Sequence, residues 1–271
     1  MDVDFDRRFG GIGRLYGGAA LARFKRARVC VVGVGGVGSW AAEALARSGV
    51  GAITLVDLDN IAESNTNRQI HALEETFGQA KVTAMAARIR GINPECELAE
   101  VEDFVTPENV GSLLDGGFDF VIDAIDEVRT KVAMIAWCRD KHLPIIVAGG
   151  AGGKVDPTRI EVDDLARTVQ DPLLARVRSQ LRKIHGFTRD PKKKFGVTAV
   201  FSTEPLRSPQ NETACDAMPG STPDSSQGSA PASPPASGGL NCAGFGSSMC
   251  ITASFGLFAA SIALRHLSEH P

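Results

Sequence analysis

Residues 33–81 contain two groups of side chains whose types and spacing are suited to binding phosphate. The first is a glycine-rich run that directly follows a short apolar segment and has glycine at Gly33, Gly35, Gly36 and Gly38. A strand, a glycine turn and a helix form an anion site, because the helix begins with unpaired N–H groups and the positive end of its dipole. Glycine lets the backbone approach a phosphate where a side chain would collide. The run therefore predicts a nucleotide-binding loop.

The acidic residue Asp57 follows this loop at the spacing that is typical of dinucleotide-binding proteins. In those proteins a carboxylate about 20 residues beyond the glycine loop holds a ribose hydroxyl. Asp57 directly follows the next apolar run, so it fits that role. The loop and the acid alone favour NAD, and an NAD-dependent oxidoreductase is one alternative for the function.

The second group contains polar and cationic side chains that a dinucleotide site does not require. It comprises Asp59, Asn65, Arg68 and Lys81. When a carboxylate attacks the α-phosphorus of a triphosphate, donors are needed along the whole row of phosphates. Arg68 and Lys81 can neutralise charge on a leaving pyrophosphate, and Asn65 can donate hydrogen bonds without adding charge. The group indicates activation of a substrate by ATP, although a solvated turn with a helix cap would use similar residue types.

Two acids, Asp123 and Asp126, end a further apolar run, and Asp126 is a candidate metal ligand. A carboxylate at the carboxyl edge of a buried strand would face the same crevice as the glycine loop, where it can hold Mg²⁺ against phosphates. Asp123 is the weaker candidate. Asp126 could also cap the helix that follows, as acids at strand ends often do. The sequence thus predicts that Asp126 binds Mg²⁺, caps a helix, or does both.

Short apolar runs alternate with longer amphipathic segments along the first half of the chain. Such alternation predicts an α/β fold with a mostly parallel central sheet and helices on both faces, and ligands then bind at the carboxyl ends of the strands. In the first of these helices Val37, Ala41 and Leu45 recur at helical spacing and give one buried face. The expected strands are 29–34, 52–56, 96–101, 118–125, 144–148 and 195–202, and the expected helices are 38–48, 79–91, 127–142 and 171–185.

The length of 271 residues and the hydrophobic content of 43% allow one large α/β core. The net charge of −3 gives no general reason to expect nucleic acid, so any polyanion site must be local. The apolar stretch 249–264 is short for a membrane span, and we expect a packed helix there, with a subunit interface as one place for it. Residues 205–239 are rich in proline, serine and glycine and predict a flexible surface insertion.

Six cysteines are scattered along the chain without a C-x-x-C pair, and the N-terminus lacks a basic-then-apolar leader. These features favour reduced thiols in a cytoplasmic protein. Cys242 is a candidate nucleophile or sulfur acceptor, but we interpret it as a loop thiol.

The combination of motifs resembles the E1-like superfamily of adenylating enzymes, which includes ubiquitin-activating enzymes and activators of sulfur-carrier proteins. The resemblance is carried by G-x-G-G-x-G from Gly33, by D-x-D-x-x-x-x-S-N-x-x-R-Q from Asp57, and by Lys81 and Asp126. It implies a Rossmann-like, E1-type ATP-binding fold in which residues 1–271 form a single adenylation domain that carries the insertion.

The resemblance also implies a role for each of these residues. Asp57 would hold the ATP ribose, Asn65, Arg68 and Lys81 would bind the phosphates, and Asp126 would bind Mg²⁺. The four glycines and Asp59 complete the expected nucleotide-binding set.

The N-terminal segment resembles the one that lends an arginine to the ATP site of a partner subunit, which implies a homodimer. Arg14 is the expected catalytic arginine and joins Arg68, Lys81 and Asp126 in the catalytic set, while Arg8 is the next choice. The alternative for Arg14 is a surface charge in a flexible arm.

Within the superfamily the chain resembles the enzymes that dehydrate N6-threonylcarbamoyladenosine (t6A) in tRNA to its cyclic form. Shared segments begin at Arg8, Arg14, Asp156, Phe201 and Thr252. The resemblance implies MgATP-dependent formation of an acyl-adenylate on a tRNA that bears t6A in its anticodon loop. The other alternative is activation of a ubiquitin-like sulfur-carrier protein, but such activators generally hold zinc through two C-x-x-C pairs. A cysteine desulfurase is a further partner that the resemblance admits.

The segment 167–194 provides a local site for a polyanion such as tRNA. It contains nine Lys or Arg residues against only Asp171 and Asp190. Such a cluster is suited to phosphate contacts that position an RNA without reading its sequence. The alternative is a solvated basic helix face.

Overall fold

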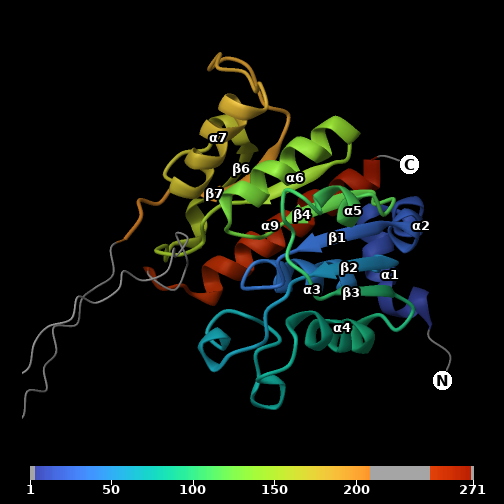
Figure 1. Ribbon diagram of the computed structural model, residues 1–271. Coiled ribbons are helices and arrows are strands. Elements are labelled where there is room, and N and C mark those ends of the chain that lie inside the picture. Colours follow the sequence, from blue (N-terminus) through green and yellow to red (C-terminus); the bar gives the residue numbers. More distant parts are fainter. Residues whose placement is uncertain (1–3, 208–244, 270–271) are drawn as a thin grey trace, which may run out of the picture.

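The computed structural model describes residues 4–207 and 245–269, which are built around one seven-stranded sheet (Figure 1). The strand order is β3-β2-β1-β4-β5-β7-β6, and neighbouring strands are parallel except for β6 and β7. The mostly parallel α/β sheet predicted from the sequence is therefore confirmed. The strands are β1 (Arg28–Val32), β2 (Ala52–Val56), β3 (Glu97–Val101), β4 (Phe120–Asp123), β5 (Ile145–Ala148), β6 (Ile160–Asp164) and β7 (Thr198–Ser202).

The register of the parallel strands brings their carboxyl ends to one edge of the sheet. Val32 of β1 lies opposite Val56 of β2 and opposite Asp123 of β4, and Asp123 lies opposite Val147 of β5. The segments that follow β1, β2, β4 and β5 therefore emerge side by side. In an open α/β sheet this edge is where ligands bind.

Helices cover both faces of the sheet because alternate strand residues point to opposite sides. On β1, Val29 and Val31 belong to one core cluster, whereas Cys30 and Val32 belong to another. Strands buried on both faces read as continuous apolar runs, and this is why the sequence identified them well. The first face carries α3 (Gly38–Arg47), α4 (Lys81–Ile92) and α9 (Met249–Glu269), and the second carries α5 (Val110–Leu114), α6 (Val128–Lys141) and α7 (Pro172–Ile184).

Two helices precede β1, in the segment for which the sequence left open a flexible arm. They are α1 (Phe5–Tyr16) and α2 (Gly18–Arg26). The carboxylate of Asp4 accepts a hydrogen bond from the Arg7 N–H at 2.9 Å and caps α1. Phe9 is buried beside Gly49, just beyond the end of α3. The N-terminal segment is therefore a packed helix rather than a flexible arm.

Several short elements were also not predicted. They are β6, α5 and the 3₁₀ turns η1 (Glu63–Asn65), η2 (Glu74–Thr76), η3 (Pro157–Arg159) and η4 (Leu165–Arg167). The insertion predicted at 205–239 lies outside the described residues except for 205–207, and so does Cys242.

Helix α9 confirms the packed helix predicted near the C-terminus. Among the described residues it is the one helix long and apolar enough to cross a membrane, but 56% of its most apolar window is buried inside the protein. It crosses α3 closely, because a side chain at Gly256 would overlap the carbonyl oxygen of Val37. We therefore interpret α9 as a core helix.

A buried ion pair fixes the end of β4 to helix α6. The Lys131 Nζ lies 2.7 Å from the Asp123 Oδ1, and both side chains are fully buried. The same Asp123 oxygen accepts a hydrogen bond from the Ile125 N–H at 3.2 Å. The pair therefore constrains the loop that carries Asp126.

Changing Lys131 to Met is expected to lower the free energy of unfolding by about 3–5 kcal/mol, because it leaves a buried carboxylate without its partner. Lys141→Met, on the exposed last turn of the same helix, is the control and should change stability by about 0.5 kcal/mol or less. Both effects can be measured by urea denaturation. Adding Asp123→Asn to Lys131→Met should restore part of the loss, and equal effects of the two lysine variants would contradict the assignment.

Candidate functional site

The glycine run forms a tight loop between β1 and α3, and each glycine has its own surroundings. Gly33 has φ = +85°, and a Cβ there would lie 3.0 Å from the backbone of Ala124. A Cβ on Gly38 would overlap the carbonyl oxygen of Gly33. These two glycines permit close packing, whereas the nearest atom to a Cβ on Gly35 would be a Gln69 nitrogen at 3.9 Å. The backbone near Gly35 is therefore open to a ligand.

Asp57 ties the end of β2 to this loop. Its Oδ2 accepts a hydrogen bond from the Val34 N–H at 2.7 Å, and its Oδ1 accepts one from the Asp59 N–H at 2.9 Å. Each carboxylate oxygen can accept more than one hydrogen bond. Asp57 can therefore hold the loop and still accept a hydroxyl from a ligand.

Lys81 begins helix α4 and is 6% exposed. Its Nζ lies 2.6 Å from the Asp59 Oδ2 and 3.6 Å from the Asp57 Oδ1. The backbone N–H of Lys81 also donates to the Asp59 carbonyl at 3.0 Å. The two carboxylates hold the ammonium group close to the glycine loop.

Asn65 and Arg68 are brought to the same place by the turn η1. The side-chain oxygen of Asn65 accepts a hydrogen bond from the Ala62 N–H at 3.1 Å. The Arg68 guanidinium donates to the carbonyl of Ser64 at 2.7 Å and to the side chain of Asn67 at 2.9 Å. Asn65 thus supports the turn, as the alternative interpretation expected, and both residues also line a cavity.

Asp126 lies in the loop between β4 and α6, three residues beyond the end of the strand. Its side chain is exposed, lines the same cavity, and has no hydrogen bond or ion pair to the described residues. The prediction that Asp126 caps α6 is wrong. Glu127 is the cap instead, because its carboxylate accepts hydrogen bonds from the Arg129 and Thr130 N–H groups at 2.9 and 2.6 Å.

The environment of Glu127 explains why it stays charged in this role. Partial burial raises the pKa of its carboxyl. The two helix N–H groups, the Thr130 hydroxyl and the Arg129 charge together lower this pKa by more than burial raises it, so the pKa lies below its ordinary value. Asp123 is held in its buried ion pair and does not line the cavity. Asp126 is therefore the carboxylate of this loop that is free to meet a metal.

The cavity has a volume of about 740 Å³ and lies at the carboxyl edge of the sheet. Among the predicted nucleotide-binding residues, Gly38 alone does not line it, because its place is in the packing behind the loop. Arg14 does not line it either. The predicted residues that do line it are Gly33, Gly35, Gly36, Asp57, Asp59, Asn65, Arg68, Lys81 and Asp126.

The position of Arg14 is at the other end of the sheet. Helix α1 packs beside Gly49, beyond the end of α3, whereas the cavity is at the beginning of α3. Arg14 is exposed on α1. Arg8, the second choice, donates to the carbonyl of Ile92 at 2.8 Å. Neither arginine enters the site of its own chain.

Other residues of the cavity were not assigned a role from the sequence. Gln69 is buried, and its Oε1 has no hydrogen-bond partner in the described part of the chain. Gly149 and Gly150 follow β5, so the strand-end rule that selected Asp57 and Asp126 would have found them. Leu173 and Thr252 come from α7 and α9, and only the packing of those helices brings them to the cavity.

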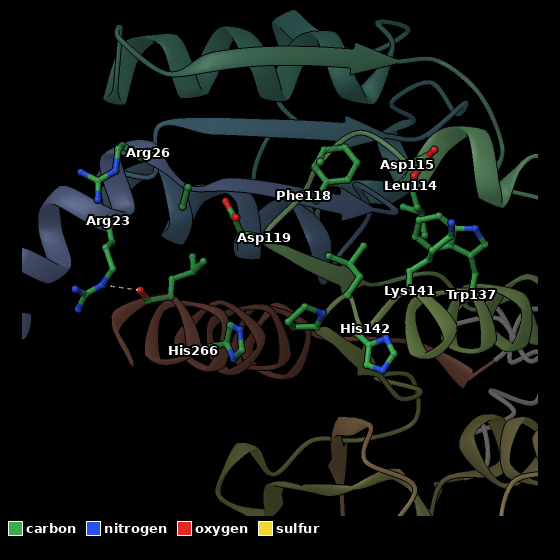
Figure 2. A pocket seen from close by; sticks show the side chains of 15 residues that line it. Arg23, Arg26, Leu114, Asp115, Phe118, Asp119, Trp137, Lys141, His142 and His266 are labelled. Carbon is green, nitrogen blue, oxygen red and sulfur yellow. Dashed lines mark hydrogen bonds between the residues drawn. The ribbon is translucent and has the colours of Figure 1, made fainter. Parts of the chain in front are cut away.

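A second cavity, of about 570 Å³, lies at the opposite edge of the sheet (Figure 2). Its lining includes Arg23, Arg26 and Lys141, but none of the residues predicted to bind a nucleotide. Arg23 donates to the carbonyls of Leu267 and Ser268 at the end of α9. Its charge therefore complements a helix C-terminus, and this cavity is not the nucleotide site.

The fold and the first cavity define a nucleotide-binding α/β protein with a glycine loop, strand-end acids and a cationic turn. The sequence matches the model of the ThiF family over residues 12–271, and the chain belongs to that family.

Two relatives match nearly the whole chain. The tRNA threonylcarbamoyladenosine dehydratase of Escherichia coli is 52% identical over 96% of this chain and 93% of its own length. The enzyme of the same name from Haemophilus influenzae is 48% identical over 95% and 92%. A crystal structure of the Escherichia coli dehydratase in complex with ATP superposes with a TM-score of 0.82 at 48% identity, covering 97% of this chain and 94% of that one. The superfamily and the fold inferred from the sequence are confirmed.

Changing Gly38 to Ala is expected to lower the free energy of unfolding by about 1–3 kcal/mol, because the new methyl group would overlap the Gly33 carbonyl. Displacement of the loop should also weaken ATP binding, which calorimetry can measure. Gly91→Ala is the matched control, since nothing lies within 4 Å of a Cβ there and alanine favours the helix by about 0.5–1 kcal/mol. Normal ATP affinity in the Gly38 variant would show that the loop does not bind the nucleotide.

Proposed function

We propose that this protein is an ATP-dependent dehydratase that converts t6A in tRNA to cyclic t6A. The observation that carries the proposal is the agreement of two findings. Relatives matched along nearly the whole chain are dehydratases of this kind, and all the residues expected to bind ATP except Gly38 line one cavity at the carboxyl edge of the sheet. An oxidoreductase would leave the cationic turn unused, and the molybdopterin-synthase adenylyltransferase of Salmonella typhimurium matches only 45% of this chain, at 36% identity.

ATP is assigned to the cavity at the carboxyl edge of the sheet. Asp57 receives the ribose, with lone pairs left over from its two backbone hydrogen bonds. Gly35 provides an open backbone for the phosphates, and the volume of about 740 Å³ is within the range of small-molecule sites. The structure of the Escherichia coli relative with ATP supports this assignment.

Arg68, Lys81 and Asn65 are assigned to the phosphates. Lys81 carries three donor hydrogens and already lies between two carboxylates. A triphosphate would take up the remaining donor capacity while Asp59 keeps the ammonium in place. Arg68 is half-buried and would redirect its guanidinium from the Ser64 carbonyl and the Asn67 side chain to the phosphates.

Mg²⁺ is assigned to Asp126. In the described residues no group of three or more His, Cys, Asp or Glu is placed to hold a metal, so this is not a pre-formed all-protein site. Mg²⁺ commonly binds through one or two carboxylates together with substrate phosphates and water. The free Asp126 carboxylate fits that requirement, and the ion would neutralise charge on the phosphates.

The reaction has two steps. A carboxylate oxygen of the threonylcarbamoyl group attacks the α-phosphorus of ATP, which forms an acyl-adenylate and releases pyrophosphate. The carbamoyl portion then closes on the activated carbonyl and expels AMP, so that water is lost overall. Arg68 and Lys81 stabilise the leaving pyrophosphate, and the walls of the cavity hold the two reactants together.

Arg14 is assigned to the ATP site of a partner subunit in a homodimer. Its exposure on α1, at the end of the sheet away from its own site, is compatible with this role. Leu15 beside it is 76% exposed, and burial of such an apolar side chain would stabilise a subunit interface.

The tRNA is assigned to the basic segment around α7. Three of its arginines make intramolecular contacts: Arg178 donates to the Thr168 hydroxyl, Arg182 donates to the Thr188 carbonyl, and Arg167 lies 3.9 Å from the Asp163 carboxylate. The others are better placed for phosphate contacts. These exposed cations are Arg176, Lys183, Arg189, Lys192, Lys193 and Lys194.

The proposed function is tested by incubating the protein with MgATP and tRNA that bears t6A, followed by mass spectrometry of the nucleosides. We expect conversion of t6A to a product lighter by one water, together with AMP and pyrophosphate. Absence of conversion, with the protein folded and able to bind ATP, would contradict the proposal.

Asp126→Asn should lower the turnover of t6A at least about a hundredfold, because it removes the negative charge for the metal while keeping size and hydrogen bonding. The thermal unfolding temperature should be unchanged, since the exposed Asp126 side chain makes no hydrogen bond or ion pair within the described part of the chain. A variant whose turnover stays within a factor of a few of the wild type would rule out the metal assignment.

Arg14→Ala and Lys81→Ala proteins should each be inactive alone and should recover activity when mixed and allowed to exchange subunits. A heterodimer would contain one site with both changes and one site with neither. Activity of the mixture is measured beside a label that reports subunit exchange. Complete exchange without recovery would place Arg14 outside the partner's site.

A further inference from the structure

A third cavity, of about 370 Å³, adjoins the nucleotide cavity on the side of helix α7. Its lining comes from the beginning of α6 and from α7, which lie side by side (Figure 1). The two cavities share Asp126, Glu127 and Leu173. The two cavities therefore adjoin each other, and the candidate metal ligand Asp126 lies at the boundary between them.

Each of the two adjoining cavities has cations of its own. The cations of the nucleotide cavity, Arg68 and Lys81, come from the segments that follow β2. On the α7 side the cation is Arg176, which is exposed and has no ion pair or hydrogen bond to the described residues. The carboxylate of Glu127 is occupied by the cap of α6. Arg176 is thus available to a ligand.

The acceptor substrate of an adenylation brings its own negative charge to the triphosphate. Two anions must approach each other, so a cation is needed on the side from which the carboxylate enters. An arginine guanidinium suits this need, because it binds a carboxylate through two parallel hydrogen bonds. Ser179 and Gln180, which also line the third cavity, carry neutral groups that can meet the hydroxyl and urea groups of a threonylcarbamoyl substituent.

We propose that the third cavity receives the threonylcarbamoyl group of the modified adenosine and that Arg176 binds its free carboxylate before adenylation. This inference rests on the proposed dehydratase function and adds to it the place and the anchor of the acceptor. The carboxylate reaches the α-phosphate past Asp126, at the junction of the two cavities. Arg176 binds the substrate and takes no part in proton transfer.

The test measures the affinity for t6A nucleoside and for its carboxamide analogue, each with a non-hydrolysable ATP analogue present. The two ligands have nearly the same shape, but the carboxamide lacks the negative charge and replaces one acceptor oxygen of the group that Arg176 is proposed to bind by an NH₂ donor. We expect the wild-type protein to prefer the carboxylate about tenfold or more, as for a charge-assisted hydrogen bond. Arg176→Ala should remove the preference without changing ATP affinity, and Arg176→Lys should restore part of it.

Arg129→Ala is the matched control. Arg129 is exposed on the first turn of α6 and near the two cavities, but it lines neither of them. Its removal changes the net charge by the same amount, so it should leave the preference for the carboxylate intact.

Two results would overturn the inference while leaving the dehydratase function in place. One is an active Arg176→Ala protein that still prefers the carboxylate. The other is an equal loss for both nucleosides with a larger loss for an anticodon stem-loop, which would show that Arg176 contacts a backbone phosphate instead. If the wild-type protein does not convert t6A at all, the proposed function fails and the inference fails with it.

Discussion

The close approach of Gly38 to the carbonyl of Gly33 is the contact on which the arrangement of the site depends. No side chain fits at residue 38, so α3 can begin directly against the turn that leaves β1. The same turn lies against the backbone of Ala124, which follows β4. Because Asp57 holds the Val34 N–H from the end of β2, three strand ends meet at one loop. A nucleotide in this cavity would therefore touch segments that are far apart in the sequence.

Buried charges hold the second half of the site to this loop. Asp171 caps α7 by accepting a hydrogen bond from the Leu174 N–H at 2.9 Å, and its other oxygen accepts one from the Gly150 N–H at 2.8 Å. Burial raises the pKa of the Asp171 carboxyl, although these N–H groups and the ammonium groups of Lys154 and Lys131 lower it in part. One carboxylate thus connects the segment after β5, which lines the nucleotide cavity, to the helix that carries Arg176.

This connection has a consequence for catalysis. Positions of reacting groups must be held within a fraction of an ångström for a carboxylate to attack phosphorus efficiently. The end of β4 is held by the Asp123–Lys131 pair, and α7 is held by Asp171. Asp126 and Arg176 themselves make no hydrogen bond or ion pair with residues 4–207 and 245–269. The structure therefore combines rigid supports with side chains that are available to ligands.

The sequence alone determined the class of fold and most of the nucleotide site, because both are encoded by local patterns. Strand β2 was predicted with its observed bounds, 52–56, since a strand buried on both faces is apolar throughout. The glycine run, Asp57, Arg68 and Lys81 could be chosen because parallel strands place their carboxyl ends together. Helix α7 was expected from 171, and Asp171 is indeed the residue that caps it.

Tertiary structure decided what depends on contacts between distant segments. Strand β7 begins at Thr198 rather than at 195, because the Asp164 carboxylate takes the N–H groups of Phe195 and Gly196. The cap of α6 is Glu127 rather than Asp126, because the buried Asp123–Lys131 ion pair fixes the conformation of the loop after β4. The local sequence does not predict this ion pair. Arg176 is brought to the third cavity, beside Asp126, only by the packing of α7 against α6. Hydrophobic periodicity and turn residues report on structure over a few neighbouring residues. Contacts between side chains from distant segments form only when the whole chain packs, so the sequence pattern does not predict them.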